Sequence, residues 1–207
     1  MIAVIDYGVG NLFSLKSSLA AIGQEAVVTR DQEELDRADH ILLPGVGAFG
    51  DAVKKLRSTG MDRAVLRQAA AGKPLLGICL GMQLLFETSF EYGEHQGLGL
   101  ISGQVRDIGS VLPSGLAVPH MGWNALRFPA ERPRSPIFAA LEEGEHVYFV
   151  HSYAGFACGE GLTAWTEYGA PLTAAVQRGN VYGTQFHPEK SGDVGLRILK
   201  AFCGLEG

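Results

Sequence analysis

The sequence has no long apolar run and no concentration of positive charge. It carries 17 basic and 22 acidic residues among 207, which leaves a net charge of −5 at neutral pH. Without a basic stripe, nucleic acid or an anionic membrane is not expected as a partner. No apolar run approaches the roughly 18 residues that a helix needs to cross a bilayer. Residues 1–7 also lack the charged start and long apolar core of a signal peptide, so a cytoplasmic location is expected.

Cysteine is rare as well. The three cysteines, Cys79, Cys158 and Cys203, are an odd number and lack the spacing of a metal site. Free thiols persist in a reducing cytoplasm, and we expect Cys158 and Cys203 to be structural. Gly8 and Gly10 follow an apolar strand but lack the G-x-G-x-x-G spacing of a dinucleotide loop. The sequence therefore predicts neither a metal nor a cofactor.

The first half of the chain alternates apolar strands with amphipathic helices, and 46% of all residues are hydrophobic. This alternation predicts a mostly parallel sheet with helices on both faces. From about residue 100 to 181 short β-rich runs replace the helices, so further, antiparallel strands are expected there. We expect one α/β domain, residues 1–207. The predicted strands are 2–5, 26–28, 39–43 and 74–76, and the predicted helices are 11–22, 51–56, 61–71 and 193–202. The stretch 92–99 is expected to be a loop, in which His95 is exposed to solvent.

The stretch 77–83, Gly-Ile-Cys-Leu-Gly-Met-Gln, lies between an apolar strand and a helix-forming run, 82–87. Gly-x-Cys-x-Gly is the thiol counterpart of the nucleophile elbow, in which flanking glycines permit a crowded turn. A helix N-terminus at Cys79 would favour the thiolate, and the N–H of Leu80 would point to a developing oxyanion. The alternative is that Cys79 is a small buried hydrophobe.

A second glycine-rich loop, 44–47, follows the strand that ends at Leu43. Ligands of parallel sheets bind at the carboxyl ends of strands, where both this loop and Cys79 are expected. Taken alone, the loop is a tight turn. Beside an elbow cysteine, it is better interpreted as a second oxyanion donor.

In the stretch 182–191, a strand is expected to deliver His187, which Pro188 and Glu189 follow. A thiol nucleophile needs a base, and an imidazole base needs an acceptor that holds its tautomer. His-x-Glu can supply both, although a surface turn would have the same sequence.

Two further motifs leave two interpretations open. In the stretch 119–124, Met121 and Trp123 fit either a partner surface or a buried sheet corner. In the stretch 148–153, His151 is either a base or a hydrogen-bonded structural histidine.

Together the elbow and His187-Pro188-Glu189 resemble the class I (triad) glutamine amidotransferases, in residue order and in separation. Within that class, the motifs are similar to those of the glutaminase subunits that serve histidine biosynthesis. The motifs that carry the resemblance span nearly the whole chain and are 6–11, 44–49, 77–83, 119–124, 148–153 and 182–191.

The resemblance implies a flavodoxin-like glutaminase domain that hydrolyses glutamine through a thioester. Cys79 would be the nucleophile, His187 the acid and base, and Glu189 the group that orients His187. Leu80 and Val46 would form the oxyanion hole, with a peptide flip at Val46. The residues expected to hold glutamine are Gly47, Gln83 and Ser152.

The resemblance also implies a partner, a (β/α)8-barrel cyclase subunit that receives the ammonia and with which the chain forms a heterodimer. Low activity without the partner, and activation by acceptor ligand bound to it, are expected. The residues that match interface positions are Asn11, Pro119, Met121, Trp123, Tyr148 and Lys190.

Three alternatives remain open on sequence. The first is a stand-alone glutaminase that serves aminodeoxychorismate, anthranilate or pyridoxal phosphate synthesis. The second is a cysteine hydrolase of a related α/β family, whose members carry an elbow cysteine but lack the His-x-Glu pair. The third is a catalytically silent module that scaffolds a partner, against which the intact Cys79, His187 and Glu189 argue.

Overall fold

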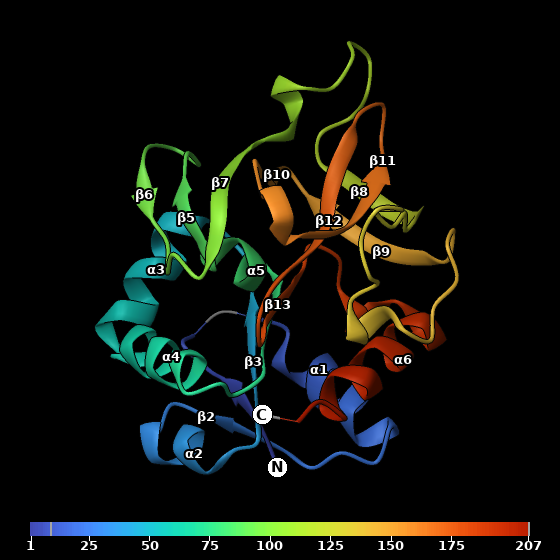
Figure 1. Cartoon of the computed structure of the whole chain (residues 1–207). Helices are drawn as coiled ribbons and strands as arrows, with labels where there is room; N and C mark the ends of the chain where they lie inside the picture. The colour runs from blue at the N-terminus through green and yellow to red at the C-terminus, as the bar shows by residue number, and fades with distance from the viewer. Residues whose placement is uncertain (9, 207) are drawn as a thin grey trace.

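The computed structural model describes residues 1–8 and 10–206 (Figure 1). Val9, within the 6–11 motif, and Gly207, the end of the predicted domain, lie outside the described residues. The strands are β1 (Ile2–Ile5), β2 (Ala26–Thr29), β3 (His40–Gly45), β4 (Leu75–Cys79), β5 (Phe86–Ser89), β6 (His95–Gln96), β7 (Ile101–Asp107), β8 (His120–Ala125), β9 (His146–His151), β10 (Tyr153–Phe156), β11 (Leu162–Glu167), β12 (Pro171–Arg178) and β13 (Val181–Thr184). The α-helices are α1 (Leu12–Ala21), α2 (Gln32–Arg37), α3 (Phe49–Ser58), α4 (Met61–Ala70), α5 (Leu80–Leu84) and α6 (Gly192–Cys203).

The main sheet has the strand order β11-β12-β13-β4-β3-β1-β2. Strands β2, β1, β3, β4 and β13 run parallel, and the β12–β11 hairpin extends the sheet antiparallel. Helices α2, α3 and α4 lie on one side of it, while α1 and α6 lie on the other (Figure 1). The expected fold, a mostly parallel sheet covered on both faces, is confirmed.

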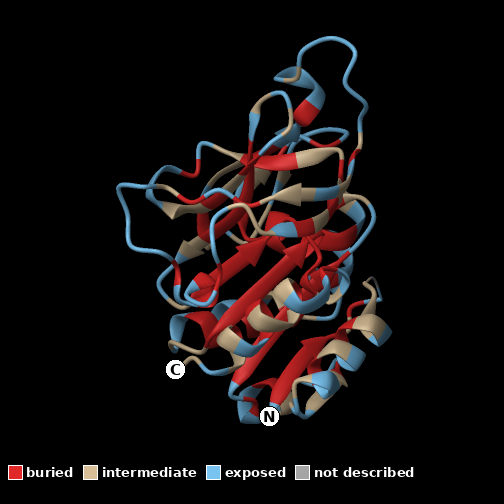
Figure 2. Ribbon diagram, turned by 90° about the vertical axis from the view of Figure 1, so that its right-hand side faces the viewer, coloured by how far each residue is buried: buried red, intermediate tan, exposed pale blue. Residues whose placement is uncertain are grey.

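Alternation along the strands explains the two helical layers. Successive side chains of a strand point to opposite faces of a sheet. In β1, Ala3 and Ile5 pack into the core beneath α2, α3 and α4, whereas Ile2 and Val4 pack into the core beneath α1 and α6. Because both faces are covered, the central strands β1, β3, β4 and β13 are buried along their whole length (Figure 2).

The β-rich second half forms two smaller sheets beside the carboxyl ends of the central strands (Figure 1). One has the order β10-β7-β5-β6, and the other is the antiparallel pair β8–β9. The antiparallel strands expected in this half are therefore confirmed, although most of them form sheets of their own.

The predicted helix over 82–87 is wrong at its end. Helix α5 stops at Leu84, and Phe86 pairs with Ile101 in a strand instead. The carbonyl of Leu84 accepts from the N–H of Leu98, and that of Leu85 accepts from Ile101. Because distant backbone supplies these partners, tertiary pairing overrides the helical propensity of this run.

Two local predictions need correction for the same reason. The stretch 92–99, interpreted as loop, contains the short strand β6, which pairs with β5. His95 was interpreted as a solvated loop residue, but its ring packs against Phe49, at 6.2 Å between centroids. Helix α2 was not predicted from the sequence.

Replacing Gly81 with alanine is expected to destabilise the fold by about 3 kcal/mol or more. A Cβ at this position would lie 1.7 Å from the carbonyl oxygen of Leu43, a backbone atom of β3 that has no room to shift. Urea unfolding would measure the loss. Gly161→Ala is the matched control, since its Cβ would lie 3.5 Å from the nearest backbone oxygen. Equal stability of the two variants would contradict the crowded-turn interpretation.

Candidate active site

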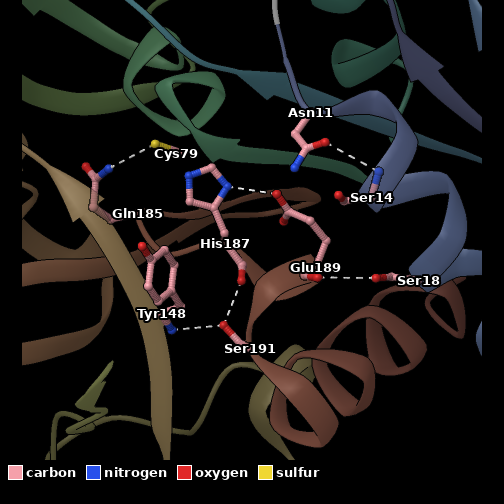
Figure 3. Close-up of polar contacts among 9 residues, drawn as sticks. All are labelled: Asn11, Ser14, Ser18, Cys79, Tyr148, Gln185, His187, Glu189 and Ser191. Carbon is pink, nitrogen blue, oxygen red and sulfur yellow. Dashed lines mark hydrogen bonds and ion pairs between the residues drawn. The ribbon is translucent and has the colours of Figure 1, made fainter. Parts of the chain in front are cut away.

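Three neighbouring strands deliver the predicted catalytic residues to one edge of the main sheet. Cys79 ends β4 and pairs with Gly45 at the end of β3. On the other side of β4, β13 leads into Gln185 and His187. Carboxyl ends of parallel strands meet at such an edge, so residues far apart in sequence come together (Figure 3).

Cys79 occupies a left-handed backbone conformation, with φ of 56°. Such an angle is costly for a residue with a side chain, and strained residues of this kind cluster at functional sites. This conformation directs the Cys79 Sγ towards the residues that follow β13. Its distance to the Gln185 Nε2 is 3.8 Å (Figure 3). The predicted elbow is therefore present as a geometry, with Cys79 between β4 and α5.

His187 is held between Cys79 and Glu189. Its Nδ1 lies 2.8 Å from Oε1 of Glu189, and both side chains are 3% exposed. Its backbone is fixed as well, because His187 N–H donates to the Tyr148 carbonyl and Ser191 Oγ donates to the His187 carbonyl. The His-Pro-Glu segment is thus a buried, ordered turn, and the surface-turn alternative is excluded.

Electrostatics favour the imidazolium form of His187. Burial alone lowers its pKa, but hydrogen bonds and charge interactions with Cys79 and Glu189 outweigh burial and raise the pKa to about 10. An imidazolium between a sulfur and a carboxylate is the arrangement that a thiolate nucleophile requires.

The loop 44–47 is anchored on both sides. The Tyr7 hydroxyl donates to the Pro44 carbonyl at 2.9 Å, and the Phe49 N–H donates to Glu91 Oε2 at 2.7 Å. Val46, between these anchors, is 41% exposed. The two hydrogen bonds therefore fix the chain on either side of Val46 and Gly47.

A cavity of about 330 Å³ opens beside Cys79. It brings together the predicted oxyanion and glutamine residues with the nucleophile and base. Its lining consists of Val46, Gly47, Cys79, Leu80, Gln83, Glu91, Pro119, Val150, His151, Ser152, Tyr153 and His187. A larger hollow of about 750 Å³ between the loop 128–136 and the β11–β12 hairpin contains none of the predicted site residues.

Glu91 was missed by the sequence analysis. It follows β5 on a loop without a recognisable motif, and its buried carboxyl group lines the cavity. Burial raises the pKa of Glu91 above its usual value, and the hydrogen bond from the Phe49 N–H offsets only part of this rise. No local signal marks Glu91, because it meets the site only through tertiary contacts.

Several of the predicted interface residues lie on the β8–β9 pair, of which Val150 and His151 line the cavity. Met121 and Trp123 are 62% and 56% exposed on β8, which excludes the buried-corner alternative for Trp123. The Trp123 and Tyr148 rings pack edge to face, and Lys190 Nζ lies 5.9 Å from the Tyr148 ring centroid. Pro119 lines the cavity. Asn11 caps α1 by accepting from the Ser14 N–H (Figure 3).

Within residues 1–8 and 10–206, no group of three or more His, Cys, Asp or Glu side chains is arranged to hold a metal ion. Among the helices of the described chain, none has the length and apolar character of a transmembrane segment.

The folded chain is expected to lose stability as the pH rises from 6.5 through 10. The folded-state pKa of His187, about 10, exceeds the unfolded value of 6.5. Protonated His187 therefore stabilises the fold fully below pH 6.5, and that contribution disappears as the pH passes the folded value. Urea unfolding at both pH values would measure the loss, which should be smaller for His187→Gln. An equal loss in both proteins would contradict the assignment.

The elbow cysteine, the buried His-Glu pair and the covered parallel sheet define a class of enzyme. Residues 3–203 match the family model for glutamine amidotransferase class-I. Two solved structures show the same fold: a glutamine amidotransferase (TM-score 0.74, 22% identity, 98% of this chain and 100% of that one) and PurLQS from Thermotoga maritima (TM-score 0.72, 21% identity, 98% and 96%). The chain is therefore a class I glutamine amidotransferase.

Relatives of higher sequence identity show to which family within this class the chain belongs. The chain is 48% identical to the imidazole glycerol phosphate synthase subunit HisH of Wolinella succinogenes, over 99% of this chain and 100% of that protein. It is 50% identical to the subunit HisH of Geobacillus kaustophilus, over 99% and 97%, and of Syntrophotalea carbinolica, over 98% and 98%. Within its class, the chain belongs to the HisH family.

Proposed function

We propose that this chain is the glutaminase subunit of imidazole glycerol phosphate synthase and acts as one domain, residues 1–207. It hydrolyses glutamine and passes the ammonia to a cyclase subunit, which forms imidazole glycerol phosphate and aminoimidazole carboxamide ribotide in histidine biosynthesis. One observation carries the proposal. His187, which is hydrogen-bonded to Glu189, and Cys79 lie together at a cavity that Gln83 and Ser152 also line.

Thioester formation begins from the thiolate of Cys79 and the imidazolium of His187. The sulfur attacks the side-chain carbonyl carbon of glutamine, and negative charge moves to the amide oxygen. As the C–N bond breaks, His187 donates its proton to the departing nitrogen, which leaves as ammonia. Glu189, on Nδ1, keeps the opposite nitrogen of the ring directed at the reacting atoms.

Hydrolysis then uses the neutral imidazole. His187 takes a proton from water, whose oxygen attacks the thioester carbon, and the C–S bond breaks to release glutamate and thiolate. The ion pair is regenerated without any external proton or electron. The same ring serves as acid in the first half and as base in the second.

Charge on the amide oxygen needs two donors. The Leu80 N–H follows the nucleophile, where an elbow places its first oxyanion donor. The loop around Val46 supplies the second, through a peptide flip between its two anchors. One such donor typically contributes about 3–4 kcal/mol of transition-state stabilisation, so this loop can switch the enzyme.

The cavity lining also accounts for glutamine binding. Gly47, Gln83 and Ser152 surround the cavity next to Cys79 and hold the substrate. Glu91 is an acidic group in this lining, so we assign it to the α-ammonium group of glutamine.

Glu91→Gln is expected to raise the KM for glutamine about 10- to 100-fold, with a smaller change in kcat. The amide keeps an acceptor for the Phe49 N–H but loses the charge, and a hydrogen bond to a charged group contributes about 1.5–3 kcal/mol. Steady-state glutaminase kinetics with the partner present would measure the effect. Glu94→Gln, at an exposed position three residues along, is the control. An unchanged KM would exclude Glu91 from substrate binding.

The partner in this proposal is a (β/α)8-barrel cyclase that forms a heterodimer with this chain. Exposed Met121 and Trp123 support a docking surface on β8, because aromatic residues and methionine are enriched in interfaces. Met121 pairs with Val150, which lines the cavity. The surface also includes Asn11, Pro119, Tyr148 and Lys190.

Ammonia release from glutamine tests the proposal. The chain is assayed alone, with the cyclase subunit, and with cyclase plus its acceptor ligand, using Cys79→Ala as the blank. We expect a rate that rises strongly only in the third mixture. A high rate from the chain alone that is indifferent to the cyclase would leave a glutaminase but overturn the partner.

A further inference from the structure

Two buried histidines, His120 on β8 and His151 on β9, lie outside the proposed chemistry, and His151 itself lines the glutamine cavity. His120 Nδ1 lies 3.0 Å from His151 Nε2, and His151 Nδ1 lies 2.9 Å from the Tyr153 carbonyl oxygen. At the other end, Asn124 Nδ2 lies 3.2 Å from His120 Nε2. Both imidazoles are buried, at 2% and 6% exposure. The contacts therefore form one continuous series.

Hydrogen-bond chemistry gives this series a single direction. The Tyr153 carbonyl can only accept, so His151 must carry its proton on Nδ1 and present Nε2 as an acceptor. His120 must then donate from Nδ1, which leaves its Nε2 to accept from the Asn124 amide. The remaining Asn124 amide proton goes to the Glu167 carbonyl, at 2.9 Å.

Only neutral rings satisfy this arrangement. A second proton on His151 would place two N–H groups against each other, as would reversal of either tautomer. Burial lowers the pKa of His120 to about 4 and that of His151 to about 3, which agrees with two neutral rings. The His120 ring is further held by stacking on Phe149 and Tyr168, at centroid distances of 4.8 and 4.2 Å.

The series ends on an atom that also holds a substrate-binding side chain. The Tyr153 carbonyl accepts from Gln83 Nε2 at 2.9 Å, and the same Nε2 lies 3.0 Å from Gln185 Oε1. Gln83 lines the cavity, and Gln185 Nε2 lies near Cys79 Sγ. The position of the Tyr153 carbonyl therefore determines where the Gln83 amide can lie.

We propose that His120 and His151 are positioning residues that hold the Tyr153 carbonyl, and through it Gln83, in the geometry that binds glutamine. The proposal rests on the proposed function, since it assigns a role within the glutamine site. It gives the two histidines no part in proton transfer to substrate.

The tautomers provide a direct test. Nitrogen-15 NMR of labelled histidine side chains, in the complex with unlabelled cyclase at neutral pH, should show His120 and His151 neutral and protonated on Nδ1. A charged ring, or a proton on Nε2 of either residue, would overturn the directional series. This readout does not depend on activity.

Kinetics test the positioning role. His151→Phe removes the donor to Tyr153, and the KM for glutamine in the activated complex should rise about 3- to 10-fold, the equivalent of one hydrogen bond, with kcat within about twofold. His151→Asn can still donate to Tyr153 from its amide and should restore the KM to within about twofold of wild type. His146→Phe, exposed on the same strand, is the control and should behave as wild type.

A double substitution separates positioning from a general effect on folding. In a Gln83→Ala background, His151→Phe should raise the KM no further, because its effect passes through Gln83. A fall in kcat with unchanged KM, failure of the asparagine rescue, or additive effects with Gln83→Ala would each overturn the proposal. If the wild-type complex itself shows no glutaminase activity, the proposed function fails instead, so the two failures are distinguishable.

Discussion

Replacing Cys79 with alanine will lower the glutaminase kcat of the activated complex by about 10⁴-fold or more. The sulfur is the atom that forms the thioester, and no other thiol can substitute, since neither Cys158 nor Cys203 lines the cavity beside Cys79. Glutamate formation, followed in a coupled assay with cyclase and acceptor ligand, would measure the loss. Little effect on stability is expected, because alanine keeps the Cβ of the elbow.

Free ammonium provides the internal control for this variant. If the chain only supplies ammonia, ammonium salt should support product formation by the Cys79→Ala complex at the rate of the wild-type complex. Retained glutamine hydrolysis in a folded variant would remove Cys79 from the mechanism. Absence of glutaminase activity from the wild-type complex as well would instead favour the interpretation of a catalytically silent module.

Glu189→Gln is expected to have the next largest effect, a fall in kcat of about 10²- to 10⁴-fold. The substitution preserves the size of the side chain but removes the charge that holds Nδ1–H of His187 at 2.8 Å. It should also lower the pKa of His187, because the carboxylate is one of the groups that raise it. Steady-state kinetics and the pH dependence of kcat/KM would measure both consequences.

The control for this substitution is Glu160→Gln, at an exposed position away from the cavity. It should leave kcat and the pH profile unchanged. If Glu189→Gln kept wild-type kcat with an unaltered profile, the carboxylate would be a structural partner of His187 without effect on the chemistry.

The relatives decide one question that the motifs left open. An elbow cysteine with His-x-Glu would serve any class I glutaminase, including those for aminodeoxychorismate, anthranilate or pyridoxal phosphate. Identities of 48–50% to HisH subunits across nearly the full length favour the histidine pathway. The buried, hydrogen-bonded His187-Glu189 pair also separates the chain from a cysteine hydrolase that lacks this pair.

Prediction from sequence succeeded where the signal is local. Strand β1, helices α1, α4 and α6, and the elbow at Cys79 follow from apolar periodicity and from glycine spacing within a few residues. It failed at 86–87, where a helical run becomes a strand because Ile101 and its neighbours supply hydrogen bonds from a different part of the chain.

By itself, the sequence determined the kinds of chemistry available: a strained thiol, an imidazole with a carboxylate two residues away, and alternating strands and helices. Those features depend on short-range sterics and on which face of an element is apolar. Only the tertiary structure decided which groups meet. It brings Gln185 to Cys79 across 106 positions and Glu91 to Phe49 across 42. It also brings His120, His151 and Gln83 into one series of hydrogen bonds. Contacts between residues so far apart in sequence arise only when separate sheets pack together.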